Sequence, residues 1–382
     1  MYNTIFPLKR FQTIETPFYY YDLELLGKTL KELREASNYP GFCVHYAVKA
    51  NSNPEVLRHI ALSGLGADTV SIGEVQAAVI AGFPAKKIVF SGVGKTEREI
   101  RKALEIGIGC FNVESREELK VIEEVASEMR IDAPVSIRIN PNIDAHTHQY
   151  ITTGLSENKF GVTIETALFL IKECRRSKCI TFKGIHFHIG SQIVDLKPYI
   201  LLCQRINEII EMLDDGDTLT INVGGGLGID YDNPDDHPVP DFKSYFKVFR
   251  DNLLLKKGQE LHFELGRAVV AQCGSLICRT IYVKEGKGKK FVILDGGMTA
   301  LIRPALYQAH HVIQNLSSES VESEFYDVVG PICESSDVFG VNEKLPITSR
   351  GDVIAIRSAG AYGEVMASTY NCRPLPKSVF SR

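Results

Sequence analysis

The stretch Cys43-Val-His-Tyr-Ala-Val-Lys-Ala-Asn51 decides the fold, because it begins a pattern that most of the chain repeats. Its first part, Cys43–Val48, is rich in β-branched and aromatic residues and predicts a strand. The amphipathic segment Pro54–Ser63 predicts a helix, and Ala67–Ser71 predicts the next strand. Strand, helix and strand in this order indicate a parallel βαβ unit.

The same alternation continues to about Glu264. Six more strands are expected at Lys87–Ser91, Gly109–Val113, Pro134–Asn140, Lys183–Ile189, Leu219–Gly224 and Leu261–Glu264. Helical patterns lie between them, among them Ser115–Met129, Ile164–Arg175, Lys197–Leu213 and Phe242–Leu255. Eight repeats favour an α/β fold with a (β/α)8 TIM-type barrel, and a doubly wound open sheet is the main alternative.

After about Ala271 the pattern changes to strands joined by mostly non-helical links. The strand-like segments are Gly274–Val283, Lys290–Leu294, Tyr326–Val329 and Asp352–Ile356. The start of the chain also looks extended at Thr13–Tyr21. We therefore expect a barrel domain at 23–270 and a second, mostly β domain formed by 1–22 and 271–382.

Composition narrows the classes of function. The chain has 382 residues, a length that favours two domains. The net charge of -4 comes without a basic run, so we expect no nucleic-acid partner. The sequence has no apolar stretch of roughly 18 residues, the length needed to span a membrane, so we expect no membrane partner. Met1–Arg10 lacks the apolar region of a secretory signal, which predicts a cytoplasmic location. The nine cysteines are scattered and indicate reduced thiols, not disulfides or a zinc site.

Lys49 and a histidine pair stand at the ends of predicted barrel strands, where the chemistry of such barrels occurs. Lys49 is either a salt-bridge lysine or a nucleophile that forms a Schiff base with an aldehyde cofactor. His186 and His188, spaced to share one face of a strand, either bind a metal or place an imidazole on a flat cofactor ring. A second pair, His146 and His148, has the same spacing. Neither pair has an obvious set of Asp and Lys co-ligands at other strand ends, so we expect no metal.

Two further motifs follow predicted barrel strands. Gly224-Gly-Gly-Leu-Gly228 is either a tight turn or a phosphate-binding loop, and its spacing fits neither the Rossmann fingerprint nor the P-loop. Glu264-Leu-Gly-Arg267 would bury a carboxylate that needs a cationic partner. That partner is either Arg267 or a protonated pyridine nitrogen.

The β domain contributes three motifs that are unspecific when taken singly. They are Arg303-Pro-Ala-Leu-Tyr307, Cys333-Glu-Ser-Ser-Asp337 and Ala359-Gly-Ala-Tyr-Gly363. The glycines around Tyr362 indicate a tight turn that presents its ring, and Cys333 is either structural or catalytic.

Taken in order, these segments resemble the pyridoxal-phosphate decarboxylases of group III, which have the alanine-racemase-like fold. The match extends from about Phe18 to Arg373. Within that group the chain is most similar to the diaminopimelate decarboxylase family. The segments that carry this closer likeness are Arg138–His148, Ile151–Gly154, Lys159–Gly161 and Arg303–Tyr307.

The resemblance implies a role for each matched residue. Lys49 would hold pyridoxal 5'-phosphate as a Schiff base, His188 would stack on its ring, and Cys333 would donate a proton. The other implied cofactor contacts are Ser191, Gly226, Glu264, Leu265, Gly266, Arg267 and Tyr362. The implied substrate contacts are Arg267, Arg303, Tyr307, Glu334 and Tyr362. Leu265 departs from the family, in which many members carry proline at this position.

The implied reaction is decarboxylation of meso-2,6-diaminopimelate to L-lysine and CO2 by a homodimer with shared active sites. The alternatives are a related decarboxylase acting on arginine, ornithine or carboxynorspermidine, or a racemase on the same fold. A metal-dependent barrel hydrolase and a catalytically silent cofactor-binding protein are the alternatives from other classes.

Overall fold

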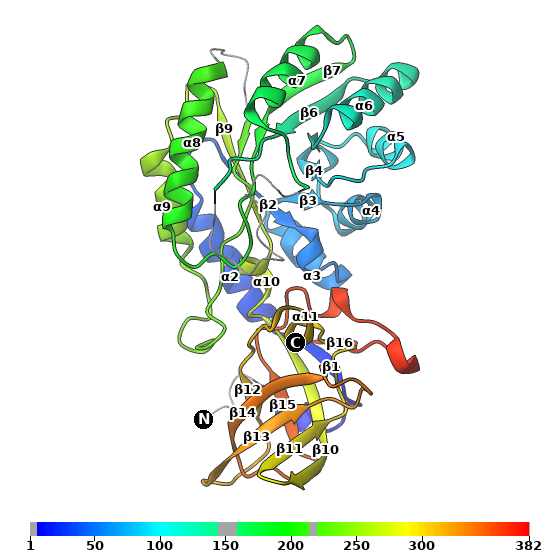
Figure 1. The fold of residues 1–382 in the computed structure, drawn as a ribbon, viewed down its shortest axis with the longest axis vertical. Helices are drawn as coiled ribbons and strands as arrows, with labels where there is room; N and C mark the ends of the chain where they lie inside the picture. Colours follow the sequence, from blue (N-terminus) through cyan, green and yellow to red (C-terminus); the bar gives the residue numbers. More distant parts are fainter. Residues whose placement is uncertain (1–5, 144–158, 214–219, 382) are drawn as a thin grey trace. The chain divides into compact units, whose positions relative to one another are not determined.

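A computed structural model describes residues 6–143, 159–213 and 220–381 (Figure 1). The chain divides into two compact units. The barrel unit comprises Thr29–Gly228 and Asp241–Val269, and the β unit comprises Met1–Lys28, Ile229–Pro240 and Val270–Arg382. The segment Ile229–Pro240, which falls inside the range expected for the barrel, makes its contacts in the β unit.

The barrel unit contains a closed barrel of eight parallel strands in chain order. The strands are β2 (Phe42–Ala47), β3 (Gly66–Thr69), β4 (Ile88–Phe90), β5 (Cys110–Val113), β6 (Ala133–Arg138), β7 (Ile180–His186), β8 (Thr220–Asn222) and β9 (Glu260–Leu265). The last strand pairs with the first, Cys43 lying opposite His262, and this pairing closes the sheet. The closure confirms the barrel and excludes the open sheet.

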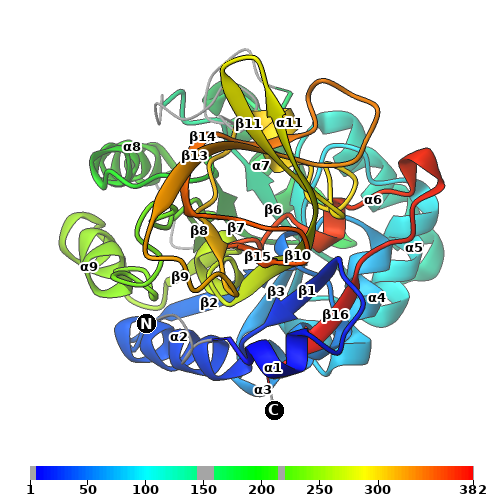
Figure 2. The ribbon, with the colours of Figure 1, turned by 90° about the horizontal axis from the view of Figure 1, so that it is seen from below.

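Helices surround these strands, as Figure 2 shows. They are α3 (Pro54–Leu62), α4 (Ile72–Ala81), α5 (Glu97–Ile106), α6 (Arg116–Met129), α7 (Ile164–Arg176), α8 (Lys197–Leu213) and α9 (Phe242–Asn252), and α2 (Leu23–Ala36) precedes them. Polar caps fix where several of them begin. Thr96 and Glu99 form a capping box at α5, and Ser115 caps α6. The sequence therefore sets both the strand ends and the helix starts around the barrel.

The β unit is a sheet of eight strands. They are β1 (Phe18–Tyr21), β10 (Gly274–Gly286), β11 (Lys289–Leu294), β12 (Ile313–Asn315), β13 (Ser323–Val329), β14 (Val338–Pro346), β15 (Val353–Ile356) and β16 (Lys377–Phe380). Its short helices are α1 (Leu8–Phe11) and α11 (Arg303–Tyr307), while α10 (Arg267–Val270) ends the barrel unit, except for its last residue. Strand β1 lies between β10 and β16, so the expectation that the first residues join the β sheet is correct (Figure 2).

Aromatic side chains fill the space between β9 and the helices that cover it. Phe263 on β9 packs edge-on against Phe246 and Phe249 of α9, with ring centroids 4.8 and 5.2 Å apart. Tyr245 joins the same cluster, and all four rings are buried. Rings of this size contribute a large share of the burial that stabilises a fold. They fix the position of β9, the strand that carries Glu264.

Strands β7 and β8 both end earlier than the sequence predicts. Strand β7 ends at His186, so His188 lies in the loop after it and does not share the strand face. Strand β8 ends at Asn222, so Gly224 is the second residue of the loop that follows. In a parallel barrel all such loops emerge at one end. No helix in the described ranges has both the length and the apolar character needed to cross a bilayer.

Candidate active site

Lys49 lies at the carboxyl end of the first barrel strand. It sits in a short 3-10 turn, Val48–Ala50, that directly follows β2, and its side chain is half-buried. Charge interactions couple it to Asp68 of β3 and to His188. Burial, together with the carboxylate of Glu264, raises the pKa of Asp68 well above its usual range, although the Lys49 ammonium opposes the rise. Lys49 thus lies near titratable side chains at the carboxyl end of the barrel.

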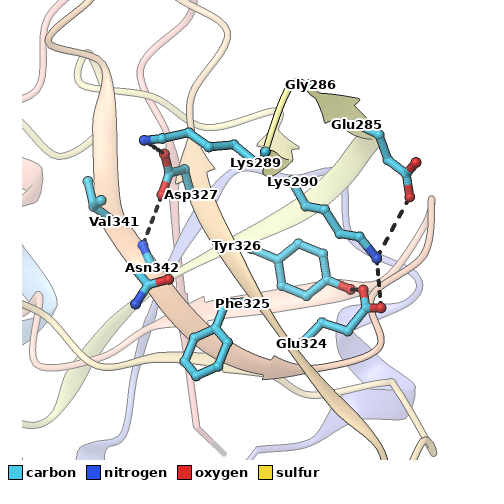
Figure 3. Close-up of a pocket in the computed structure, with 11 residues that line it drawn as sticks. Glu285, Gly286, Lys289, Lys290, Glu324, Phe325, Tyr326, Asp327, Val341 and Asn342 are labelled. Atoms are coloured by element: carbon cyan, nitrogen blue, oxygen red, sulfur yellow. Dashed lines mark hydrogen bonds and ion pairs between the residues drawn. The ribbon is translucent and has the colours of Figure 1, made fainter.

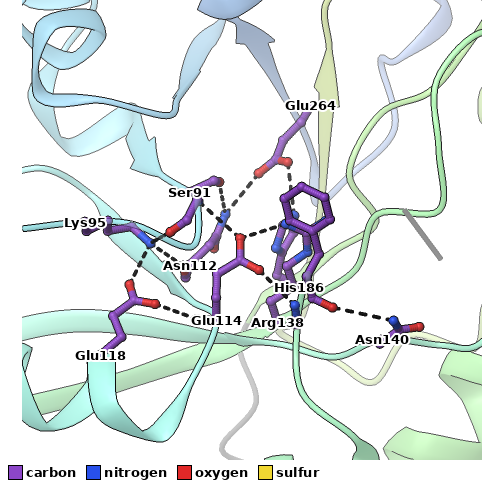
Figure 4. Close-up of polar contacts among 12 residues, drawn as sticks. Ser91, Lys95, Asn112, Glu114, Glu118, Arg138, Asn140, His186 and Glu264 are labelled. Atoms are coloured by element: carbon purple, nitrogen blue, oxygen red, sulfur yellow. Dashed lines mark hydrogen bonds and ion pairs between the residues drawn. The ribbon is translucent and has the colours of Figure 1, made fainter. Parts of the chain in front are cut away.

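Glu264 presents a buried carboxylate that is held in place from three other strands. Nε2 of His186 lies 3.1 Å from Oε2, and Asn112 and Asn222 donate to Oε1 at 3.1 and 2.7 Å (Figure 4). Burial alone would raise the pKa of Glu264, but the charge interaction and the hydrogen bond with His186 outweigh it and lower the pKa below its usual range. The carboxylate is therefore ionised inside the barrel.

Arg267, one of the two partners expected for Glu264, has a different contact. Its Nη2 donates to Ser191 Oγ at 3.0 Å, so the structure brings two of the expected cofactor residues together. The contacts that hold the carboxylate come from His186, Asn112 and Asn222. The expectation that Arg267 is the partner of the acid is not supported by these contacts.

A hydrogen-bond chain connects Glu264 with the surroundings of Lys49. Asn112 also donates to Ser91 Oγ at 2.9 Å, and Ser91 donates to Asp68 Oδ1 at 2.9 Å. Sequence reasoning missed all three of these residues. Their signal was present, because each is a polar residue at or near the carboxyl end of an apolar strand.

His188 is held as a neutral ring. The Gly225 N–H donates to its Nδ1 at 3.2 Å, so Nδ1 accepts and the proton of the neutral imidazole lies on Nε2. Burial and the nearby Lys49 ammonium lower the pKa of His188 well below its ordinary value. A neutral imidazole in a fixed orientation presents a flat face next to Lys49.

The loop after β8 needs its glycines because other backbone segments lie too close for side chains there. A methyl group added at Gly225 would overlap the carbonyl of Glu264, and one added at Gly226 would lie 2.6 Å from the carbonyl of Gly190. Gly226 also has φ +106, a conformation that favours glycine. A loop of small residues in such conformations exposes backbone N–H groups to an anion.

A second, deeper layer supports this barrel end. Arg138 Nη1 donates to Glu114 Oε1 at 2.7 Å, and the Gly161 N–H donates to Oε2 at 2.9 Å. Both side chains of the ion pair are less than 10 % exposed. Although burial opposes it, Arg138 holds the pKa of Glu114 below its usual range. The expected motif residues His146, His148 and Ile151–Gly154 lie outside the described residues.

Another lysine, Lys95, is buried near the same end of the barrel. Lys95 donates to Glu118 at 2.6 Å and to two backbone carbonyls at 2.8 Å, those of Gly92 and Asn112 (Figure 4). Its side chain is 1 % exposed. Lys95 therefore ties the loop after β4 to β5 and to α6.

In the β unit, Arg303 is buried and aligned by its neighbours. Its Nη1 donates to Nε2 of His311 at 2.9 Å, and Nδ1 of His311 donates to the carbonyl of Arg357 at 2.8 Å. The guanidinium lies 4.9 Å from the ring centroid of Tyr231. A cation fixed in this way binds a carboxylate with little loss of side-chain entropy. Tyr307, at the end of the same helix, is half-buried.

Cys333 and Glu334 lie in the exposed loop between β13 and β14. Asp337 anchors that loop by accepting hydrogen bonds from the backbone N–H groups of Met298 and Ile332 at 2.6 and 2.7 Å. Glu334 accepts a hydrogen bond from the hydroxyl of Tyr370 at 2.8 Å.

Tyr362 occupies a turn between two glycines and has φ 57. A methyl group on Gly363 would overlap the carbonyl of Ala359, so the turn needs a glycine there.

A surface hollow in the β unit contains none of the expected residues. Strands β10, β11, β13 and β14 line it, and its charges are paired, Lys289 with Asp327 and Lys290 with Glu324, each at 2.7 Å (Figure 3). Glu285 shares Lys290 with Glu324, so every lysine and carboxylate that lines the hollow is in an ion pair.

Comparison with known proteins identifies the family. Residues 26–271 match the family model described as the pyridoxal binding domain of pyridoxal-dependent decarboxylases. A diaminopimelate decarboxylase from Bacteroides thetaiotaomicron is 58% identical over 380 residues, which cover 99% of this chain and 98% of the relative. The chain belongs to the diaminopimelate decarboxylase family.

Solved structures of family members agree with this assignment. The diaminopimelate decarboxylase of Helicobacter pylori, complexed with L-lysine, has a TM-score of 0.93 and 43% identity, covering 99% of this chain and 94% of that one. The enzyme of M. jannaschii, also in complex with L-lysine, has a TM-score of 0.87 and 36% identity, covering 98% and 89%. The recognised family and the fold expected from the sequence are both confirmed.

The barrel end fits the family's pyridoxal phosphate. The ionised Glu264 is suited to a protonated pyridine nitrogen, because an opposite charge nearby favours the charged ring. The loop Gly224–Gly226 would hold the phosphate, and a side chain there would fill the cradle. Lys49 would supply an amine for the aldehyde. The expected cofactor is thus consistent with the residues present.

We predict that replacing Arg138 by Met destabilises the protein by about 3–5 kcal/mol, because Glu114 is left as a buried charge without its cation. Chemical denaturation followed by circular dichroism measures the change. Arg116→Met is the matched control, since its ion pair with Glu173 is solvent-exposed. The double change Arg138→Met with Glu114→Gln should recover part of the loss, and equal losses for Arg138→Met and Arg116→Met would contradict the assignment.

Proposed function

We infer that this chain catalyses the pyridoxal-phosphate-dependent decarboxylation of meso-2,6-diaminopimelate to L-lysine and CO2. The observation that carries the inference is the likeness to diaminopimelate decarboxylases along nearly the whole chain. Two of those relatives are described in complex with L-lysine, the product of this reaction. The reaction is a carboxy-lyase step at the end of lysine biosynthesis.

We propose that Lys49 binds the cofactor covalently and that His188 stacks on its ring. The further proposed contacts are Ser191, Gly226, Glu264, Leu265, Gly266, Arg267 and Tyr362. When bound, pyridoxal phosphate withdraws electrons from the α-carbon of an attached amino acid and stabilises the charge left by the loss of CO2. In this proposal the barrel, 23–270, binds the cofactor, while 1–22 and 271–382 supply substrate and catalytic residues.

Glu264 has a defined task in this proposal, which is to keep a proton on the ring nitrogen of the cofactor. An acid raises the pKa of an adjacent pyridine nitrogen only if the acid itself is ionised. The donors His186, Asn112 and Asn222 hold the carboxylate in that state. The hydrogen bonds around Glu264 therefore act on the reaction without touching the substrate.

The choice of substrate follows from charge. Diaminopimelate carries a second ammonium and a second carboxylate far from the reacting carbon, whereas ornithine carries only the ammonium. We propose that Arg303 binds the distal carboxylate and that Glu334 binds the distal ammonium, with Tyr307, Arg267 and Tyr362 as the other substrate contacts. The hydrogen bond to His311 and the Tyr231 ring hold Arg303 ready for this role.

We propose that Cys333 donates the proton that returns to the α-carbon, with Lys49 as the alternative donor. Cys333 is an exposed thiol on an anchored loop, which makes it accessible to a ligand.

We further propose that the enzyme is a homodimer in which Cys333 and Glu334 serve the active site of the partner chain. All nine cysteines are free, as a reducing compartment would keep them, which supports a proposed cytoplasmic location.

The proposed substrate is tested by measuring CO2 release from meso-diaminopimelate and from ornithine, with the wild type and with Arg303→Met. We expect turnover of diaminopimelate by the wild type, and a loss of roughly 10- to 100-fold in its kcat/KM in the variant, because a charged hydrogen bond to the distal carboxylate is gone. Arg303→Lys, which keeps the charge, is the matched control. If ornithine were used as fast as diaminopimelate by the wild type, the substrate assignment would be wrong.

The role of Glu264 is tested with Glu264→Gln, which is almost isosteric but uncharged. We expect turnover to fall by roughly 10²-fold or more while the affinity for pyridoxal phosphate changes much less, because only the charge at the ring nitrogen is removed. Glu264→Asp keeps the charge and should retain more activity. An equal loss of cofactor binding and turnover would show that Glu264 only helps to hold the cofactor.

Cys333 is tested with Cys333→Ala, for which we expect turnover to fall by roughly 10²- to 10⁴-fold, the usual effect of losing a proton donor. Cys372→Ser, which changes another exposed thiol of the β unit, is the matched control and should retain activity. Full turnover by Cys333→Ala would show that Cys333 is not the proton donor.

Mixing inactive Lys49→Ala and Cys333→Ala subunits should restore activity, because each mixed dimer contains one intact site. A mixture of the two variants that stays inactive would contradict an active site shared between subunits.

A further inference from the structure

The end of the barrel opposite to the candidate active site carries a cluster of metal-binding side chains. Sγ of Cys43, a carboxylate oxygen of Glu260 and a ring nitrogen of His262 all lie within 4.8 Å of one another. We propose that these three residues form a zinc site that joins the first and last strands of the barrel. It is separate from the cofactor chemistry proposed above.

The barrel register places these side chains together. Cys43 on β2 lies directly opposite His262 on β9, in the pairing that closes the barrel. Glu260 lies two residues before His262 on the same strand, so both side chains point to one face. Side chains from two strands far apart in the sequence thus converge at the point where the sheet closes.

A hydrogen-bond relay fixes which nitrogen of His262 is available. The backbone carbonyl of Lys87 only accepts, so the proton of His45 lies on Nδ1, 3.2 Å from that oxygen. Nε2 of His45 then accepts from Nδ1–H of His262 at 2.9 Å. The remaining nitrogen, Nε2 of His262, carries a lone pair that faces the cluster. A ligand histidine oriented by a hydrogen bond on its other nitrogen is the usual arrangement at metal sites.

The lone pair of His262 Nε2 points at another acceptor. It lies 3.2 Å from Oε2 of Glu260, a distance that requires a positive centre between the two atoms. A proton would satisfy that pair. It would leave no role for the third donor, Cys43 Sγ, which converges on the same point. A metal ion satisfies all three donors at once.

Ligand type and spacing select zinc. Thiolate, imidazole and carboxylate together suit Zn²⁺, whereas Ca²⁺ and Mg²⁺ prefer oxygen ligands alone. In a tetrahedral site with bonds of about 2.0–2.3 Å, neighbouring ligand atoms are about 3.3–3.8 Å apart. The Glu260–His262 pair already has nearly this spacing, and Glu260, whose side chain is 54% exposed, is able to adjust. Thiolate and carboxylate together balance the charge of the ion, and water completes the four ligands.

Along β9 the Cα atom of Glu260 lies about 13 Å from that of Glu264, and the Cα atom of His262 about 7 Å from it, at about 3.3 Å per residue. In barrels of this class the amino-terminal end serves stability. A cation bound only by the folded barrel stabilises it, and here it would do so across the closing pair of strands. The ligands share no short sequence motif, so sequence reasoning predicted no metal.

The test is to incubate the holoenzyme with ZnCl₂, remove free metal by desalting and measure retained zinc by mass spectrometry. We expect about one zinc per chain in the wild type and less than about a tenth of that in Cys43→Ser and His262→Gln, since each loses one of three ligands. Cys110→Ser, a thiol at the start of another barrel strand, and Cys372→Ser, an exposed thiol, should retain the zinc. Added zinc should also raise the thermal midpoint of the wild type but not of Cys43→Ser.

X-ray absorption at the zinc edge of the loaded wild type gives a readout that needs no variant. We expect one sulfur ligand with nitrogen and oxygen ligands. A wild type that retains no zinc, zinc that is retained by Cys43→Ser but lost from Cys372→Ser, or a site with two or more sulfur ligands would each overturn the proposal.

Discussion

A carboxylate kept charged inside a barrel is the interaction on which the rest of this structure depends. Glu264 is buried, and water cannot stabilise its charge. Its stabilisation comes from His186, Asn112 and Asn222, which lie on three further strands. Isolating a carboxylate from water costs several kcal/mol unless such donors surround it. Only a closed barrel brings β5, β7, β8 and β9 to one point, so the fold and the charge require each other.

The rest of the barrel end follows from the same constraint. The chain of hydrogen bonds from Asn112 through Ser91 reaches Asp68, which is coupled to Lys49. The ion pair of Glu114 and Arg138 supports the adjacent loops from below. A network of this kind is rigid when each member is satisfied. It holds Glu264 and Lys49, the two groups that we propose for the nitrogen and the aldehyde of the cofactor, in fixed positions.

The sequence predicted the barrel because strand and helix periodicity repeats eight times, and it predicted the family because six short motifs occur in one order. Its errors have physical reasons. His188 and Gly224 lie beyond their strands, because the apolar pattern that predicted those strands continues past their ends. The sequence offered Arg267 or a pyridine nitrogen as the partner of Glu264, whereas the hydrogen bonds to its carboxylate come from other strands. Asn112, Asn222 and the Cys43 cluster were missed for the same reason, since only the register of the barrel brings them together.

The most direct test of the account is to locate the cofactor. The holoenzyme is reduced with borohydride and digested, and the peptides are analysed by mass spectrometry. The account predicts a pyridoxyl phosphate adduct on Lys49, at about one per chain, and none in the Lys49→Ala variant. An adduct on another lysine, such as Lys95, or no adduct after pyridoxal phosphate is supplied in excess, would contradict it.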